Sequence, residues 1–184
     1  MIRILGISGS LRKGSFNTAL LRAARSVAGD GIEVTIATLH GIPLYDGDAE
    51  ISGGIPAAVT ALREQIIASD GVLLATPEYN NSIPGVFKNA IDWLSRPPSE
   101  APRTFSNRAF ALVGATPGGF GTILAQDAWL PVLRTLGTRQ WNGAKMLVSR
   151  AGEAFDASGK LTSEAVAKQL GDYVKNFAAF AANK

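Results

Sequence analysis

Hydroxyl and amide side chains gather with an arginine and two glycines in one short segment, Gly9-Ser-Leu-Arg-Lys-Gly-Ser-Phe-Asn-Thr18. Phosphate groups are bound by this kind of chemistry. A helix N-terminus offers unpaired N–H groups and a partial positive charge, hydroxyls add donors, and a guanidinium can bridge two phosphate oxygens. The candidate phosphate ligands are Ser10, Arg12, Ser15, Asn17 and Thr18. A simple helix cap beside a solvated arginine is the alternative.

The spacing of the glycines restricts the kind of phosphate. Gly6, Gly9 and Gly14 do not form the Gly-x-Gly-x-x-Gly pattern of dinucleotide-binding loops, and no Gly-Lys-Ser or Gly-Lys-Thr of a nucleoside triphosphate loop is present. The segment therefore favours a monophosphate.

A second polar segment follows the apolar run Gly71–Thr76 and opens an amphipathic helix. It reads Pro77-Glu-Tyr-Asn-Asn-Ser-Ile-Pro-Gly-Val-Phe-Lys-Asn-Ala-Ile-Asp-Trp-Leu94. In an open α/β sheet, loops at the carboxyl ends of strands line the crevice in which ligands bind. We expect a planar polar ligand beside Pro77–Ser82.

The elements that must position these segments alternate between strand-length apolar runs and longer stretches with helical periodicity. The predicted strands are Ile2–Ser8, Ile32–Thr38, Gly71–Thr76, Ala109–Ala115 and Lys145–Ser149. The predicted helices are Asn17–Ala28, Pro56–Ser69, Pro84–Ser95, Gly121–Leu136 and Thr162–Ala182. This alternation predicts an α/β fold with a parallel sheet and helices on both faces.

Turn residues support these boundaries. Pro56 and Pro84 suit the first helical turn, and Gly29 and Gly137 suit helix C-terminal caps. With the strand order 2-1-3-4-5, the first and third strands would be neighbours, and the two polar segments would face one crevice.

Composition limits the function classes. The 184 residues suit one domain, with 46% hydrophobic and 18% charged residues. The net charge is +3 with scattered Lys and Arg, which argues against a nucleic-acid or membrane partner. There is no cysteine and one histidine, so thiolate chemistry and multi-histidine metal sites are excluded. No long apolar run or basic leader is visible, and we expect a cytoplasmic protein without membrane insertion.

Two long turn-rich stretches, His40–Ile55 and Arg96–Arg108, are expected to be functional or mobile loops. His40 itself is expected to be an ordinary loop residue. Trp93 and Trp129 are expected in the core, as part of apolar helix stripes that include Leu124, Leu130 and Leu133.

Together the two polar segments describe a monophosphate with a flat ring, and here the sequence resembles a family. Gly9–Asn17 and Pro77–Leu94 are similar to the two signatures of the NAD(P)H-dependent FMN reductases, in the branch of the quinone and chromate reductases. The resemblance implies a flavodoxin-like three-layer sandwich. It also implies that the first signature binds the FMN phosphate through Ser10, Arg12, Ser15, Asn17, Phe16 and Thr18.

The second signature would wrap the isoalloxazine through Pro77, Glu78, Tyr79, Asn80, Asn81 and Ser82. Many family members carry an aromatic residue where this chain has Asn81. The backbone of Glu78–Asn80 would donate to the ring, whereas the Glu78 carboxylate could be a solvated charge. A third loop, through Thr116, Gly118 and Gly119, would approach the flavin with its backbone; its glycines could equally form a plain turn.

The resemblance further implies a homodimer or homotetramer, with the helices around Trp93 and Trp129 at subunit contacts and the active site near the neighbouring subunit. Leu44, Tyr45 and Asp46 would close over the flavin from the side or from the partner chain. The arginines of Arg96–Arg103 would lie in a solvated loop or meet the phosphates of NADPH.

The implied function is an FMN-dependent oxidoreductase that takes hydride from NADPH or NADH and reduces small electron acceptors: quinones, free flavin, chromate or azo compounds. The flavin itself carries out the hydride chemistry, so no catalytic side chain and no metal ligand is expected. The alternative is a flavodoxin-type electron carrier or a regulatory FMN-binding protein without its own NAD(P)H site. The slight basicity and Arg12 disfavour a flavodoxin.

Overall fold

The computed structural model describes residues 1–183. Its strands are β1 (Ile2–Ser8), β2 (Ile32–Ala37), β3 (Gly71–Ala75), β4 (Ala109–Ala115), β5 (Arg139–Gln140) and β6 (Met146–Val148). They form one parallel sheet with the order β2-β1-β3-β4-β5, and β6 also pairs with β4. The predicted order 2-1-3-4-5 is confirmed.

The longer helices are α1 (Phe16–Val27), α3 (Ala57–Ala68), α4 (Gly85–Leu94), α6 (Ile123–Thr135) and α8 (Glu164–Ala182). Each matches a predicted helix within two residues at either end. The short helices α2 (Gly47–Gly53), α5 (Ala101–Phe105) and α7 (Ala151–Ala154) were not predicted. Among residues 1–183, every helix is too short or too polar to cross a lipid bilayer.

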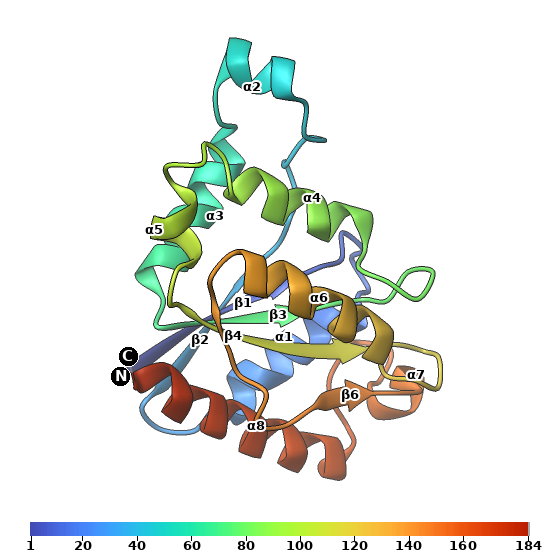
Figure 1. Ribbon diagram of the computed structural model, residues 1–184. Coiled ribbons are helices and arrows are strands. Elements are labelled where there is room, and N and C mark those ends of the chain that lie inside the picture. The colour runs from blue at the N-terminus through green and yellow to red at the C-terminus, as the bar shows by residue number, and fades with distance from the viewer. Residues whose placement is uncertain (184) are drawn as a thin grey trace.

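The sheet is the middle of three layers (Figure 1). Helices α1 and α8 cover one face, and α3, α4 and α6 cover the other. Successive strand residues point to opposite faces, so Leu73 packs with Leu20 and Phe177 while its neighbour Leu74 packs with Phe87 and Trp129. Burial on both sides explains why the central strands are almost purely apolar.

The fifth strand position is split, which the sequence did not predict. Residues Arg139–Gln140 pair with the start of β4, and Met146–Val148 pair with its end. Between them, Trp141 packs edge-on against Tyr173 of α8, with ring centroids 4.6 Å apart. The Trp141 N–H still donates to the Phe110 carbonyl of β4 at 2.8 Å, so the pairing lapses only over the exposed residues 142–145. The predicted strand Lys145–Ser149 is therefore only the second half.

The turn residues behave nearly as expected. Pro56 and Pro84 are the N-cap residues of α3 and α4, one position before the predicted first turn. Gly29 and Gly137 directly follow the C-caps of α1 and α6 with φ of 75° and 71°, a left-handed conformation that favours glycine.

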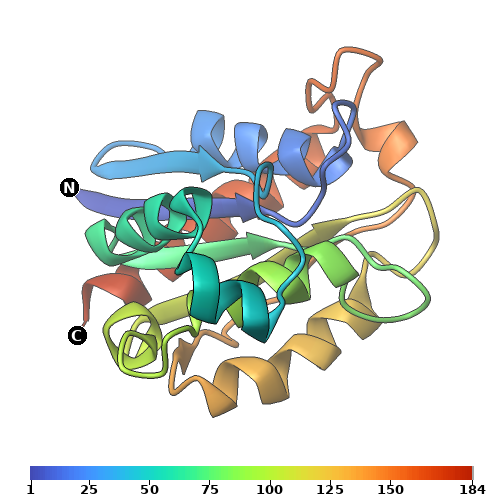
Figure 2. The same cartoon turned by 90° about the horizontal axis from the view of Figure 1, so that it is seen from above.

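The ends of the parallel strands form two opposite sides of the sheet (Figure 2). We name them the carboxyl edge, at the carboxyl ends of the strands, and the amino edge, at their amino ends. The loops after β1, β3 and β4 project together at the carboxyl edge, while the start of β1 and the end of α8 lie at the amino edge. Both predicted ligand segments thus lie at the carboxyl edge.

Candidate functional site

The loops after β1 and β3 contact each other directly at the carboxyl edge. The Gly9 N–H donates to the Ala75 carbonyl at 2.9 Å. A Cβ on Gly9 would lie 2.2 Å from Cδ1 of Phe87 and 2.9 Å from Cδ of Pro77. Only glycine at position 9 leaves room for this close approach. The approach brings the two predicted ligand segments together.

The first loop presents backbone donors that lack a protein acceptor. Within residues 1–183, the N–H groups of Leu11, Lys13 and Gly14 donate to no protein atom. The Arg12 N–H donates only to Ser10 Oγ, at 3.3 Å, and the Arg12 side chain is exposed. Ser15 is the N-cap of α1, and its Oγ accepts from the Thr18 N–H at 3.3 Å. Unpaired donors at a helix N-terminus form a site for an oxyanion.

Asn17 and Thr18 are buried and bonded to the protein. The Asn17 amide donates to the Ala115 carbonyl at 2.9 Å and accepts from the Ala115 N–H at 3.0 Å. The Thr18 hydroxyl lies 2.8 Å from that of Ser8. These bonds use the side chains that the sequence assigned to a phosphate, and they fix the first turn of α1 against β1 and β4. Phe16 is half-buried, with its ring 5.9 Å from that of Phe155.

The loop after β3 ends in a tight two-residue turn. Tyr79 and Ser82 exchange two backbone hydrogen bonds of 3.1 Å. Between them, Asn80 and Asn81 have φ of 50° and 61°, the two consecutive left-handed residues that such a turn requires. Asparagine tolerates this conformation better than an aromatic residue does. The left-handed backbone at position 81 therefore explains why an asparagine suits this position.

This turn corrects one prediction. The Tyr79 N–H already donates to Ser82, so it is not free to donate to a ring. Within residues 1–183, the N–H groups of Glu78 and Asn80 remain without a protein acceptor. Pro77 is buried, whereas Tyr79, Asn80, Asn81 and Ser82 are exposed.

The Glu78 carboxylate is more than a solvated charge. Its Oε2 accepts from the Ala125 N–H at 3.0 Å, in the first turn of α6. An acidic group there satisfies an otherwise unpaired helix donor and opposes the positive end of the helix dipole. Glu78 therefore ties the second ligand loop to the helix that follows the third.

The third loop, between β4 and α6, is held in one shape by its neighbours. The Thr116 N–H donates to Val148 at 3.0 Å, its hydroxyl accepts from the Gly118 N–H at 3.3 Å, and the Gly118 carbonyl accepts from the Arg150 N–H at 2.9 Å. Gly119 is exposed, with open space where a Cβ would stand. These hydrogen bonds connect the third loop to β6 and to the residue that precedes α7.

His40, expected only as a loop residue, has contacts on both ring nitrogens. Nδ1 lies 3.1 Å from the Thr38 hydroxyl, and Nε2 lies 3.2 Å from the Leu11 carbonyl. The imidazole therefore links the segment after β2 to the first ligand loop. No sequence pattern indicated this role, because the contact to Leu11 joins residues 29 positions apart.

The core position predicted for Trp129 is confirmed, and the alternative that its side chain lies at a subunit contact is wrong. Trp129 is fully buried within the chain, edge-on to Phe87 at 4.9 Å, and its indole N–H donates to the Thr76 hydroxyl at 3.1 Å. Trp93 is buried as well. Leu124 and Leu130 are instead the exposed members of the α6 stripe, at 43% and 36%, so expecting them in the core was also wrong.

The stretch His40–Ile55 contains α2, which stands away from the sheet beyond α3 and α4 (Figure 1). Tyr45 anchors this arm: its ring packs edge-on against Trp93 at 4.9 Å, and its hydroxyl donates to Glu50 at 3.0 Å. Leu44 is 81% exposed, and Asp46 caps α2. The arm is thus held by the Tyr45 ring and a few polar contacts, and α2 has no buried residue of its own.

The arginines of the second long stretch already have partners. Arg96 Nε lies 2.9 Å from Oε2 of Glu50, and Arg103 pairs with Glu64 and Glu100 at 3.0 and 3.1 Å. The hydrogen bond from Arg96 lowers the pKa of Glu50 below its ordinary value. In the structure, these two arginines therefore pair with carboxylates of the chain.

The residues at the carboxyl edge fit a monophosphate joined to a flat ring. Unpaired N–H groups, two serines and an exposed arginine suit the phosphate, and the adjoining loop keeps two N–H groups for polar ring atoms. The close approach of Gly9 to Pro77 and Phe87 brings the two loops that carry these groups into contact.

Several known proteins are similar to this chain in sequence and in fold. The family model described as NADPH-dependent FMN reductase matches residues 2–153. An NAD(P)H-dependent FMN reductase of Pseudomonas aeruginosa is 46% identical over 163 residues, which cover 89% of this chain and 86% of that protein. A 2-hydroxy-1,4-benzoquinone reductase of a Burkholderia species is 34% identical over 97% of this chain and 96% of its own length.

A solved structure agrees with these sequence matches. FerB of Paracoccus denitrificans, a flavoenzyme NAD(P)H:(acceptor) oxidoreductase, superposes with a TM-score of 0.87 at 32% identity, covering 99% of this chain and 98% of its own. Since the family model spans most of the residues and the relatives match nearly end to end, the chain belongs to the NADPH-dependent FMN reductase family.

Proposed function

We propose that this protein is an FMN-dependent NAD(P)H oxidoreductase that reduces quinones. The observation that carries the proposal is the first loop, which has N–H groups without an acceptor among residues 1–183 and which meets the start of the polar loop after β3 at Gly9. Membership of the family supports FMN as the cofactor and NADPH or NADH as the hydride donor.

In this proposal, the phosphate is bound by the N–H groups of the first loop together with Ser10, Arg12 and Ser15. Asn17 and Thr18 act behind them, because their side chains fix the helix N-terminus that faces the phosphate. Phe16 adds an apolar wall. A guanidinium contact to phosphate is charge-assisted, so Arg12 contributes most among the side chains.

The ring lies along Pro77–Ser82. The N–H groups of Glu78 and Asn80 donate to its polar edge, and the Tyr79–Ser82 turn limits where the ring can sit. Thr116, Gly118 and Gly119 approach with their backbone from the third loop. When bound, FMN accepts hydride and passes electrons on, so the protein supplies binding, orientation and hydrogen bonds, with no catalytic side chain of its own.

The acceptor class follows from the relatives. Their names include a benzoquinone reductase and several quinone oxidoreductases, and we extend quinone reduction to this chain. Free flavin, chromate and azo compounds remain further candidate acceptors, since an open flavin site accepts many small oxidants.

We further propose a cytoplasmic protein that folds as one domain and assembles as a homodimer or homotetramer. Exposed apolar side chains on the α6 side, Phe120 at 76%, Leu124 and Leu130, support a subunit contact there. Light scattering of Leu124→Asp beside the wild type tests the assembly: a smaller particle is expected, and an unchanged mass excludes this surface.

The test of the function is anaerobic addition of NADPH to the FMN-loaded protein, followed by visible flavin absorbance, with NADH and free FMN in parallel. We expect rapid bleaching that a quinone reverses. Bound flavin that NADPH does not bleach would contradict the reductase and favour an electron carrier.

A further inference from the structure

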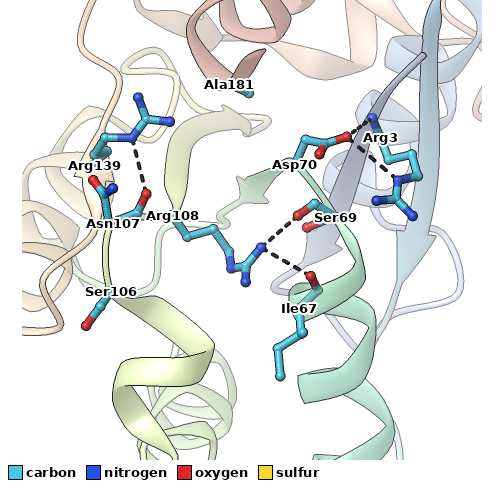
Figure 3. A pocket seen from close by; sticks show the side chains of 9 residues that line it. All are labelled: Arg3, Ile67, Ser69, Asp70, Ser106, Asn107, Arg108, Arg139 and Ala181. Carbon is cyan, nitrogen blue, oxygen red and sulfur yellow. Dashed lines mark hydrogen bonds and ion pairs between the residues drawn. The ribbon is translucent and has the colours of Figure 1, made fainter. Parts of the chain in front are cut away.

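A polar pocket of about 300 Å³ lies at the amino edge of the sheet, opposite the FMN loops (Figure 3). Its charged residues come from the starts of four strands: Arg3 in β1, Asp70 before β3, Arg108 before β4 and Arg139 in β5. The seven residues of β4 separate the two edges by roughly 20 Å. The pocket is therefore independent of the FMN site.

Arg108 is a half-buried cation that has only neutral partners. Its Nε donates to the Thr104 carbonyl at 3.0 Å, and its Nη1 donates to the carbonyls of Ser69 at 2.7 Å and Ile67 at 3.4 Å. Carbonyls fix the guanidinium plane but do not cancel its charge. Burial lowers the pKa of Arg108, and the charge of Asp70 only partly opposes this shift.

The Arg139 guanidinium likewise donates to backbone carbonyls. Its Nε donates to the Asn107 carbonyl at 3.2 Å, its Nη1 donates to the Asn183 carbonyl, and its guanidinium carbon lies 4.8 Å from the centre of the Phe180 ring. Within residues 1–183, Nη2 of Arg108 and Nη2 of Arg139 have no protein acceptor.

Among residues 1–183, the one carboxylate of the pocket lining already has a partner. Asp70 Oδ2 accepts from the Arg3 backbone N–H at 2.9 Å and lies 3.7 Å from Arg3 Nε. Three guanidinium groups and one carboxylate give the lining a formal charge of +2. Figure 3 shows Asp70 turned toward Arg3, away from Arg139.

We propose that this pocket, named here the amino-edge pocket, binds a phosphate-type oxyanion between Arg108 and Arg139. Two fixed guanidinium groups with unused Nη2 donors match the charge and the several acceptor oxygens of a phosphate. The volume admits inorganic phosphate or the phosphoryl end of a nucleotide.

The test is a titration of the full-length protein with sodium phosphate in saturating FMN, which occupies the phosphate loop at the other edge. Ionic strength is held constant with sodium chloride, and the Nε–H signals of Arg108 and Arg139 are followed by NMR. Adenosine 5′-monophosphate and adenosine are titrated in parallel, so that tighter binding of the nucleotide or of phosphate identifies the source of the oxyanion.

We expect saturable shifts with phosphate or the nucleotide and none with adenosine. Arg139→Gln should weaken binding roughly tenfold or more, because one charge-assisted contact is lost. Arg25→Gln is the matched control, since Arg25 is exposed at the end of α1 and its loss changes the net charge equally. Equal affinity in both variants would overturn the proposal.

A second variant tests the proposal through a gain in affinity, which loss of the folded state cannot produce. Asp70→Asn retains an oxygen for the Arg3 N–H but removes the carboxylate that residues 1–183 contribute to the lining. Phosphate should then bind several-fold more tightly. Unchanged or weaker binding in a folded Asp70→Asn protein would contradict an oxyanion site.

Discussion

The two edges of the sheet use the same kinds of polar group in opposite ways. At the amino edge, arginine side chains donate to backbone carbonyls at the starts of strands and the ends of helices, as Arg108 does. At the carboxyl edge, several backbone N–H groups of the first loop have no acceptor in the described part of the chain, residues 1–183. One edge thus offers fixed cationic side chains, and the other offers fixed backbone dipoles.

The difference follows from the direction of the parallel strands. Helix N-termini lie at the carboxyl edge, where unpaired N–H groups favour anions, whereas helix C-termini lie at the amino edge, where unpaired carbonyls favour cations. A cofactor that must be held closely by backbone suits the first edge. The amino-edge pocket would hold an anion through Arg108 and Arg139, whose hydrogen-bond acceptors within residues 1–183 are all backbone carbonyls.

The largest expected effect is at the contact that joins the two ligand loops. Gly9→Ala places a Cβ within 2.2 Å of Phe87, which forces the loops apart. We expect a loss of about 1–3 kcal/mol in unfolding free energy and roughly hundredfold weaker FMN binding, measured by denaturation and flavin fluorescence.

Gly14→Ala is the control for that change. It lies in the same loop, yet a Cβ there meets nothing within 4 Å. FMN affinity and stability should stay near wild type. Equal losses in both glycine variants would show that the contact at Gly9 does not organise the site.

Arg12→Ala should remove one charge-assisted contact to the phosphate, worth about 1.5–3 kcal/mol. FMN binding should weaken by roughly one to two powers of ten, while the stability of the FMN-free protein stays unchanged because Arg12 is exposed. Arg139→Gln, at the other edge, should leave FMN affinity intact. If Arg139→Gln weakened FMN binding as much as Arg12→Ala, the two edges would not be separate.

Glu78→Ala should cost about 1 kcal/mol of stability, as loss of a helix N-terminal acceptor does, and should weaken FMN binding a few-fold through movement of the loop. Glu78→Gln keeps an acceptor for the Ala125 N–H and should recover most of both. Thermal unfolding and FMN titration of the pair measure this, and identical behaviour of the two variants would remove the helix contact from the account.

The smallest effect concerns the arm that carries α2. Arg96 and the Tyr45 hydroxyl lower the pKa of Glu50 from its ordinary 4.5, so the folded arm binds fewer protons than the unfolded chain. The ion pair therefore contributes fully above pH 4.5 and is lost as the pH falls through the lowered pKa. The fluorescence of Trp93, beside Tyr45, should change below pH 4.5, and Glu50→Gln should abolish that step; an identical step in the variant would assign it to another group.

Much of this fold follows from local patterns. Apolar runs such as Gly71–Ala75 between turn residues predict central strands, and the hydroxyl-rich Gly9–Thr18 predicts a ligand loop. The partners of these residues do not follow, because they come from distant segments. Asn17 binds Ala115, 98 residues away, and Glu78 binds Ala125 on a helix that is separated from it by another strand.

The amino-edge pocket was beyond prediction for the same reason. Its arginines are scattered along the sequence and become neighbours only when four strands align. Trp129 is a different case. Its position on the helix predicted that it belongs to an apolar stripe, but only its packing against Phe87 determines which residues of that stripe are buried.

The most direct test of the central claim is a crystal structure of this protein with FMN. We predict the phosphate within hydrogen-bond distance of Ser15 and of the N–H groups of Lys13 and Gly14, with the ring along Pro77–Asn80. FMN bound at any other place, including the amino-edge pocket, would contradict the assignment of the carboxyl-edge loops.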